Sequence, residues 1–230
     1  MRNDIRTGVL AIIVFTVLLG LAYPLAMTGA GQAVFPNAAN GSRIQADGRD
    51  VGSRLLGQDF TKPVLGPDGR PKRDADGNPL FAPDPRYFQT RPSVTGNNPA
   101  ATAFSNLGPN SRDLRDAIAG SADAYVALER PFTPGLRRRD VPNDAVQTSA
   151  SNVDPHISKR NAGIQANRVA RVRGIPLIRV RQLIADATDG RSLLLLGEPG
   201  VNVLKLNIAI DREARRIAVK AGWESFFPEY

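Results

Sequence analysis

An uncharged stretch near the amino terminus, from Gly8 to Met27, constrains this chain more than any other feature of its sequence. Eleven of its twenty residues are Val, Leu, Ile or Phe. At about 1.5 Å of rise per residue, a helix of this length spans about 30 Å, which is the thickness of the hydrocarbon core of a bilayer. The stretch therefore predicts a transmembrane helix.

The charges that flank this stretch predict its orientation. Arg2 and Arg6 precede it, and only Asp4 opposes them. By the positive-inside rule, the amino terminus stays in the cytoplasm and the chain after Met27 lies outside. We therefore expect a single-pass protein of the cell inner membrane, with residues 1–30 as cytoplasmic amino terminus and anchor and with the main domain in the periplasm.

Two other interpretations of the apolar stretch remain open. A cleaved signal peptide is one, because residues 28–30 are small enough for a peptidase. Signal-peptide cores are shorter than this stretch, about 7–15 residues. The other is a buried helix of a globular protein. The length of the stretch and its lack of charged side chains favour the membrane anchor.

Composition excludes several kinds of active site. The chain has no cysteine, so it has no disulfide, thiolate nucleophile or thiolate zinc site. With one histidine and no carboxylates at ligand spacing, we expect no metal site. The phosphate-binding pattern GxxxxGK[ST] does not occur.

Basic side chains give the chain a net charge of +8. They recur without the interleaved aromatic residues that are typical of binding to nucleic acid, so we expect no nucleic-acid partner. Two interpretations stay open, a solvated face and a contact with partner protein or lipid headgroups. The basic positions are Arg137, Arg138, Arg139, Arg168, Arg171, Arg173, Arg179 and Arg181.

The pattern after the anchor predicts an α+β fold: one N-terminal transmembrane helix followed by a mixed α/β extracytoplasmic domain. The spacing of apolar residues from Arg112 to Glu129 predicts a helix with one apolar face. A second helix is expected to begin at Asp154, which can cap it, with Pro155 in the first turn. It is expected to end at Gly174. A shorter helix follows through Val180–Ala187.

Near the carboxyl end the pattern changes to that of strands. Leu193–Leu196 and Val201–Ile210 are predicted to be strands joined by a turn at residues 198–200. We expect a periplasmic domain over residues 31–211 and a C-terminal extension over 212–230. Residues 65–84 are crowded with Pro, Gly and charged side chains, and are predicted to be a surface-loop insertion.

Candidate catalytic residues are few. Ser151, Asp154 and His156 could suggest a hydrolase, but they lie in one short stretch, whereas catalytic triads are assembled from separate elements. We therefore expect a non-catalytic protein. A membrane-anchored periplasmic hydrolase and a module that binds acidic surfaces remain the alternatives.

Several long stretches together resemble one family, the C subunit of the potassium-transporting Kdp ATPase (KdpC). The resemblance runs in order from the first helix to Asp211. The stretches are LLGLAYPLAMTGAGQAVFPNAANGS at Leu18–Ser42, VGSRLLGQDF at Val51–Phe60, RYFQTRPS at Arg86–Ser93, SNLGPNS at Ser105–Ser111, VPNDAVQTSASNVDPHIS at Val141–Ser158, QANRVARVRG at Gln165–Gly174 and GEPGVNVLKLNIAID at Gly197–Asp211.

The resemblance implies an accessory subunit of an ATP-driven, high-affinity potassium uptake pump. The implied partners are a potassium-channel-like subunit, an ATP-hydrolysing P-type subunit and membrane lipid. The family role implied is that of a catalytic chaperone that raises the affinity of the hydrolytic subunit for ATP. ATP is therefore the implied ligand, although the predicted topology separates most of this chain from cytoplasmic ATP.

The chain departs from the family at two glycine-rich places. Thr102, Ala103 and Phe104 precede SNLGP where the family has glycines, and Ala150 and Asn152 replace glycines before DPHIS. Bulky residues hinder close approach of a backbone to phosphate, so phosphate binding by the first loop is not expected.

If nucleotide binds, Gln165 and Arg168 are the candidates. The candidates for partner binding are Asn40, Gly41, Ser42, Asn106, Asp154, His156, Arg171, Asn202 and Asn207.

Overall fold

A computed structural model describes residues 2–101, 103, 105–191 and 195–220. The chain divides into two compact units, Met1–Ser53 and Arg54–Tyr230.

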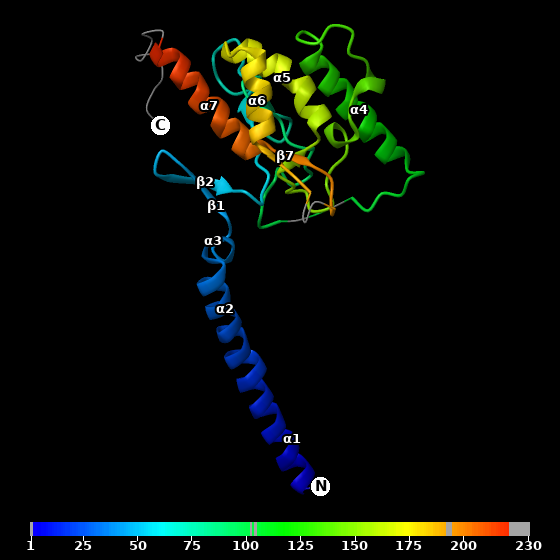
Figure 1. Cartoon of the computed structure of the whole chain (residues 1–230). Helices are drawn as coiled ribbons and strands as arrows, with labels where there is room; N and C mark the ends of the chain where they lie inside the picture. The colour runs from blue at the N-terminus through cyan, green and yellow to red at the C-terminus, as the bar shows by residue number, and fades with distance from the viewer. Residues whose placement is uncertain (1, 102, 104, 192–194, 221–230) are drawn as a thin grey trace. The chain divides into compact units, whose positions relative to one another are not determined.

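The first unit begins with one continuous helical run, Arg2–Val34 (Figure 1). It consists of α1 (Arg2–Phe15), the π-helical segment η1 (Thr16–Ala22) and α2 (Tyr23–Val34). Its most apolar window has a mean hydropathy of 2.5 and is not buried, so by length and composition the run can cross a membrane. This agrees with the apolar helix predicted from the sequence.

The wider turns of η1 precede Pro24, which has no N–H to donate. At the junction, the Tyr23 N–H donates to the Leu18 carbonyl, five residues back. The short helix α3 (Pro36–Ala39) follows, and then an antiparallel hairpin of β1 (Arg43–Ala46) and β2 (Arg49–Ser53).

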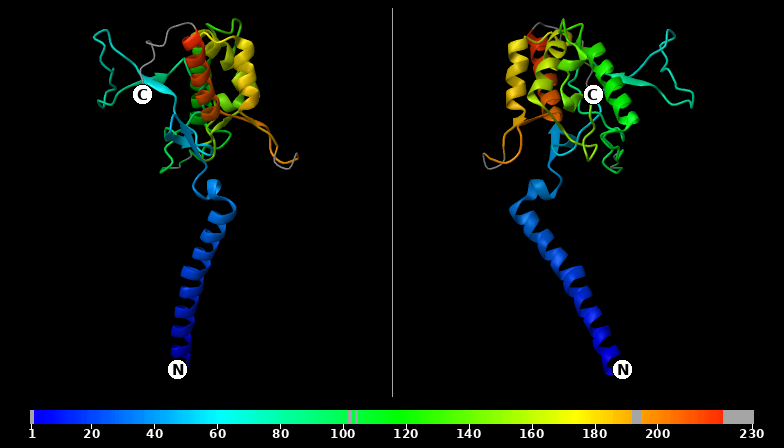
Figure 2. Two further views of the ribbon diagram at one scale, coloured as in Figure 1. Left: turned by 60° about the vertical axis from the view of Figure 1, so that its left-hand side comes forward. Right: turned by 90° about the vertical axis from the view of Figure 1, so that its right-hand side faces the viewer.

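The second unit contains a hairpin, four long helices and a small sheet. The hairpin pairs β3 (Thr61–Pro63) with β4 (Phe81–Pro83) and extends away from the helices (Figure 2). The predicted surface loop 65–84 thus contains the connection between β3 and β4 and also β4 itself, and most of it is exposed. The helices are α4 (Arg112–Glu129), α5 (Lys159–Arg173), α6 (Leu177–Asp186) and α7 (Val203–Lys220), with the 3-10 turns η2 (Arg138–Asp140) and η3 (Asn143–Ala145).

The sheet has the order β5-β7-β6, and both pairings are antiparallel. Its strands are short: β5 (His156–Ile157), β6 (Thr188–Asp189) and β7 (Gly200–Asn202). Apolar residues of α5, α6 and α7 pack around β7 and Phe88 to form the hydrophobic core.

Three sequence predictions about this unit are wrong in part. The strand predicted at Val201–Ile210 ends at Asn202, and α7 begins at Val203. Leu195 and Leu196 are exposed and outside the named strands, while residues 193–194 lie outside the described part. The expected extension from residue 212 includes the last turns of α7, where Glu213, Ala214 and Ala218 are buried.

The start of α5 also differs from the prediction. Ser158, not Asp154, caps this helix, because its side chain accepts from the Asn161 N–H. Residues 156–157 form β5 instead of a helical turn. The predicted end at Gly174 is confirmed: its φ of 64° is left-handed, which glycine adopts without strain.

Candidate functional site

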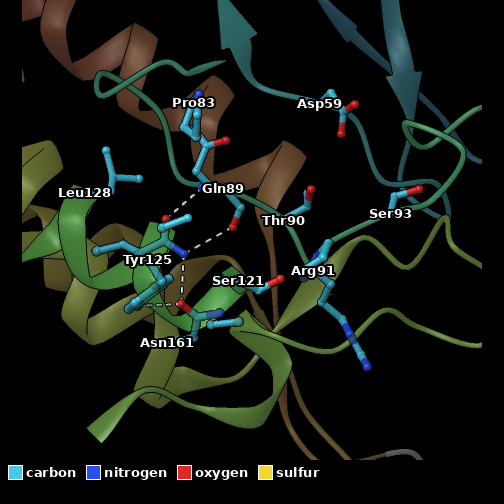
Figure 3. A pocket seen from close by; sticks show the side chains of 14 residues that line it. Asp59, Pro83, Gln89, Thr90, Arg91, Ser93, Ser121, Tyr125, Leu128 and Asn161 are labelled. Carbon is cyan, nitrogen blue, oxygen red and sulfur yellow. Dashed lines mark hydrogen bonds between the residues drawn. The ribbon is translucent and has the colours of Figure 1, made fainter. Parts of the chain in front are cut away.

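A cavity of about 240 Å³ lies beside α4, α5 and the segment from Pro83 to Ser93 (Figure 3). The segment is the one that carries the RYFQTRPS stretch. The cavity is lined by Asp59, Pro83, Gln89, Thr90, Arg91, Pro92, Ser93, Ser121, Ala124, Tyr125, Leu128, Ala145, Asn161 and Gln165. Such a concave place with converging polar groups is where a binding site is sought first.

One face of α5 carries three polar side chains in or next to the lining of this cavity. Asn161, Gln165 and Arg168 follow the spacing i, i+4 and i+7, so they share a face of the helix. All three are almost completely buried, with exposed fractions of 1%, 1% and 0%. Buried polar groups of this kind need hydrogen-bond partners, and the partners come from the neighbouring segments.

The amide of Gln165 holds the segment at Gln89. Its oxygen accepts from the Gln89 N–H at 2.7 Å and from Arg168 at 2.9 Å. Its nitrogen donates to the Gln89 carbonyl at 3.2 Å and to Asn161 at 2.9 Å. A side-chain amide has two donors and two acceptor positions. Gln165 therefore uses its full hydrogen-bonding capacity inside the protein.

Arg168 is the largest fully buried side chain in the described part of the chain. Its Nε donates to Glu129 at 2.9 Å, and its Nη1 donates to the carbonyls of Pro85 and Tyr87 at 2.7 and 2.9 Å. Arg168 was expected to lie with the other basic residues on a solvated face or a contact face. For Arg168 this expectation is wrong, because the side chain is fully buried. It joins α4 to the Pro83–Ser93 segment.

Tyr125 and Asn161 extend this network toward the start of α5. The Tyr125 hydroxyl donates to Asn161 at 2.9 Å, and Asn161 donates to the Asp144 carboxylate at 3.0 Å. Burial first, and then the charge of Glu129, raise the pKa of Tyr125. The phenol is therefore a neutral donor. Asp144 also accepts from the Ser158 backbone and hydroxyl, both at 2.8 Å.

His156 lies in a second polar cluster. One ring nitrogen, Nε2, is 3.0 Å from Asp189, and the other, Nδ1, is 3.5 Å from Asp154. Arg91 pairs with Asp154 at 3.2 Å, and Lys205 pairs with Asp189 at 3.0 Å. The hydrogen bond to Asp154 raises the pKa of His156; partial burial opposes this, and Asp189 adds to it.

Two predicted partner-binding residues, Asn202 and Asn207, are buried and bonded within the domain. Asn202 accepts from the Lys205 N–H at 3.1 Å at the start of α7, which is the role of an N-cap, and donates to the Arg54 carbonyl at 2.8 Å. Asn207 bonds both the N–H and the carbonyl of Phe88, each at 2.9 Å. The structure thus gives both residues a role in holding the fold.

The remaining predicted partner-binding residues are scattered. Asn40 and Gly41 are exposed and Ser42 is buried in the first unit, where the Gly41 carbonyl accepts from Ser53 at 2.7 Å. Asn106 and Arg171 are exposed in the second unit. Within the second unit, the predicted residues therefore do not form one exposed surface.

Several important residues of the site were missed by the sequence analysis, although a signal existed for some. Glu129 lies four residues after Tyr125, so it falls on the apolar face of α4, where a carboxylate requires a partner. Gln89 lies inside the quoted RYFQTRPS stretch. Asp144 and Asp189 gave no signal, because their partners lie 14 and 33 residues away.

Asn152 shows how a replaced glycine is accommodated. Its φ is 59°, in the left-handed region that asparagine tolerates better than most residues. Its side chain accepts from the Val94 N–H at 2.8 Å and donates to the Ala103 carbonyl. The asparagine therefore adopts a left-handed backbone conformation and makes contacts with two neighbouring segments.

Two comparisons with known proteins show the family to which the chain belongs. The family described as KdpC, K+-transporting ATPase, c chain, matches residues 5–212. A potassium-transporting ATPase KdpC subunit of Polaromonas naphthalenivorans is 46% identical over 92% of this chain and 95% of its own length. Those of Bradyrhizobium diazoefficiens and Koribacter versatilis are 43% and 39% identical over 94% and 92% of this chain, and over 100% and 95% of their own lengths. With a family match over most of its length, the chain belongs to the KdpC family, the c chains of K+-transporting ATPases.

Proposed function

We propose that this chain is a non-catalytic accessory subunit that stabilises an ATP-driven potassium uptake pump. Its apolar helix anchors it in the inner membrane, with the amino terminus in the cytoplasm and the second unit outside. Its partners are a channel-like subunit and an ATP-hydrolysing subunit. The observation that carries this proposal is that the polar groups of the candidate site are engaged in holding the domain together.

The contacts of Gln165 and Arg168 favour a structural role over binding of nucleotide. Gln165 has no hydrogen-bonding capacity to spare, and Arg168 is fully buried. A chaperone effect on the ATP affinity of the hydrolytic subunit would accordingly act through protein contacts. Calorimetric titration of the purified chain with MgATP tests this. Binding that Gln165→Ala abolished without unfolding the protein would contradict it.

The contacts of His156 and Ser151 disfavour the hydrolase alternative. Both ring nitrogens of His156 face carboxylates, while Ser151 Oγ lies 3.3 Å from the Val153 N–H and 3.5 Å from Ser149. A nucleophile must lie within hydrogen-bond reach of its base. A His156→Ala variant should therefore keep its partners, whereas a hydrolase would lose its activity.

Co-purification in mild detergent tests the proposal as a whole. Tagged full-length chain should bring down two large multi-span proteins, and its intact mass should include residues 1–30. A module that binds acidic polymers would purify without these two proteins. A mature chain that began near Gly31 and stayed in the soluble fraction would overturn the proposal.

The orientation can be tested separately, because the chain contains no cysteine. Asn3→Cys and Asn143→Cys each introduce one thiol at an exposed position, on either side of the apolar helix. A membrane-impermeant maleimide should label Asn143→Cys in cells with a permeabilised outer membrane. It should label Asn3→Cys only after lysis. The reverse pattern would show the opposite topology.

A further inference from the structure

The sole histidine of the chain joins the two outer strands of the small sheet. His156 is in β5, and its Nε2 reaches across β7 to Asp189 in β6, at 3.0 Å. In the register of the sheet, His156 faces Asn202 and Asp189 faces Gly200, so both partners flank the same central strand. The contact therefore closes the sheet across β7.

Gly200 makes this crossing possible. A Cβ at this position would lie 3.0 Å from the Cβ of His156 and 3.2 Å from its Cγ. These distances are too short for an undisturbed contact. The imidazole therefore lies directly over the backbone of β7, in space that a larger residue would fill.

Charged groups from each neighbouring element face this histidine. Asp154 precedes β5 and lies 3.5 Å from Nδ1, and its other oxygen pairs with Arg91. Asp189 is in β6, and its other oxygen pairs with Lys205 of α7. The imidazole thus lies between two carboxylates, each of which is also held by a more distant cation.

This arrangement makes the contact depend on protonation. A protonated imidazole donates from both nitrogens, and a neutral one donates from only one. Only the protonated form can therefore donate to Asp189 and to Asp154 at the same time, and a neutral ring keeps at most one of these hydrogen bonds. The side chain is about one-third exposed, so protons reach it without unfolding.

We propose that His156 is a pH-sensitive clasp, closed across β7 when the imidazole is protonated and loosened when it is neutral. The strands that it joins also hold the adjoining backbone. The Asn202 N–H donates to the Ala187 carbonyl, and the Val203 N–H donates to the Pro155 carbonyl. Loosening of the clasp therefore loosens the entry into α7. The clasp does not depend on the proposed membrane orientation, but with that orientation it would respond to the pH outside the cell.

Proton NMR of the full-length chain in detergent tests the clasp directly, because a single histidine gives a single imidazole titration. The titration midpoint should lie above the ordinary value of about 6.5. Asp189→Asn should lower it, and Lys205→Met should raise it, because Lys205 is a cation near the same carboxylate. A midpoint at or below 6.5, or one that neither variant moves, would overturn the proposal.

Hydrogen exchange provides the structural readout. After correction for the intrinsic pH dependence, the amides of Asn202 and Val203 should become less protected as pH rises through the histidine titration. The amide of Ile210, in the middle of α7, is the internal control and should not follow it. In His156→Gln, which cannot titrate, the pH-dependent change should vanish. Equal behaviour of the variant and the wild type would refute the clasp even if the midpoint were raised.

Discussion

The guanidinium of Arg168 lies 2.9 Å from the carboxylate of Glu129, and neither side chain reaches solvent. Burial raises the pKa of Glu129, and the charge and hydrogen bond of Arg168 oppose that effect. The second oxygen of Glu129 has no hydrogen-bond partner in the described structure. The pair therefore joins α4 to α5 at a considerable desolvation cost.

We predict that Arg168→Met lowers the free energy of unfolding by about 3–5 kcal/mol, because it leaves Glu129 buried without its cation. Denaturant unfolding in detergent measures the loss. The double variant Arg168→Met/Glu129→Gln should recover part of it, because no unpaired charge remains. A single variant as stable as the wild type would show that the pair is not structural.

Asn207→Leu should also be destabilising. It keeps the size of the side chain but leaves the buried N–H and carbonyl of Phe88 without partners. Each such loss costs about 1–3 kcal/mol. Thermal unfolding measures it, and Asn143→Leu, at an exposed position, is the matched control. The same melting temperature for both variants would contradict the role given to Asn207.

Gly200→Ala should disturb the sheet, because the added methyl group would lie about 3.0 Å from His156. We expect a lower melting temperature and a lower titration midpoint for the imidazole, which would be pushed away from Asp189. Gly190→Ala is the control, since an added Cβ there meets nothing within 4 Å. If the two variants titrated alike, the close approach at Gly200 would be unimportant.

Asp84 makes the domain sensitive to acid. Burial alone would raise the pKa of Asp84, but the hydrogen bonds and charge of Arg86 outweigh it, and the pKa is lowered. A carboxyl with a lowered folded pKa adds stability above its unfolded pKa of about 4, and this is lost as pH falls through the folded value.

Arg86→Ala should therefore lower stability at neutral pH, where this contribution is fully present, and move the acid unfolding midpoint to higher pH. Circular dichroism during an acid titration measures this midpoint. Arg70→Ala, an exposed arginine on the β3–β4 hairpin, should leave it unchanged. A midpoint that Arg86→Ala did not move would show that Asp84 is not held in its charged form by this contact.

The sequence predicted the features that depend on local pattern. Spacing of apolar residues within one segment predicts α4 and α6, and an uncharged run predicts the apolar helix. The end of α5 is predicted by its glycine. The helix α7 was missed because the stretch from Val201 is rich in β-branched and apolar residues. None of residues 203–210 is exposed in the structure, and a helix that is buried around most of its surface can be apolar on most of its faces.

The candidate site was less predictable, because its contacts join distant parts of the chain. Gln89 meets Gln165 across 76 residues, and Phe88 meets Asn207 across 119. No local pattern encodes such pairs. The family stretches contain these residues, but only the structure shows that Gln165 and Asn207 face inward and Arg171 faces outward.

The π-helical segment before Pro24 changes which side chains line up along the apolar helix. Each π-type turn accommodates one additional residue, and one residue of an α-helix corresponds to a rotation of about 100°. The side chains of α2 are therefore rotated about the axis relative to those that a regular α1 would continue. A neighbouring helix packed along the whole span would meet one stripe of side chains in the first half and another in the second.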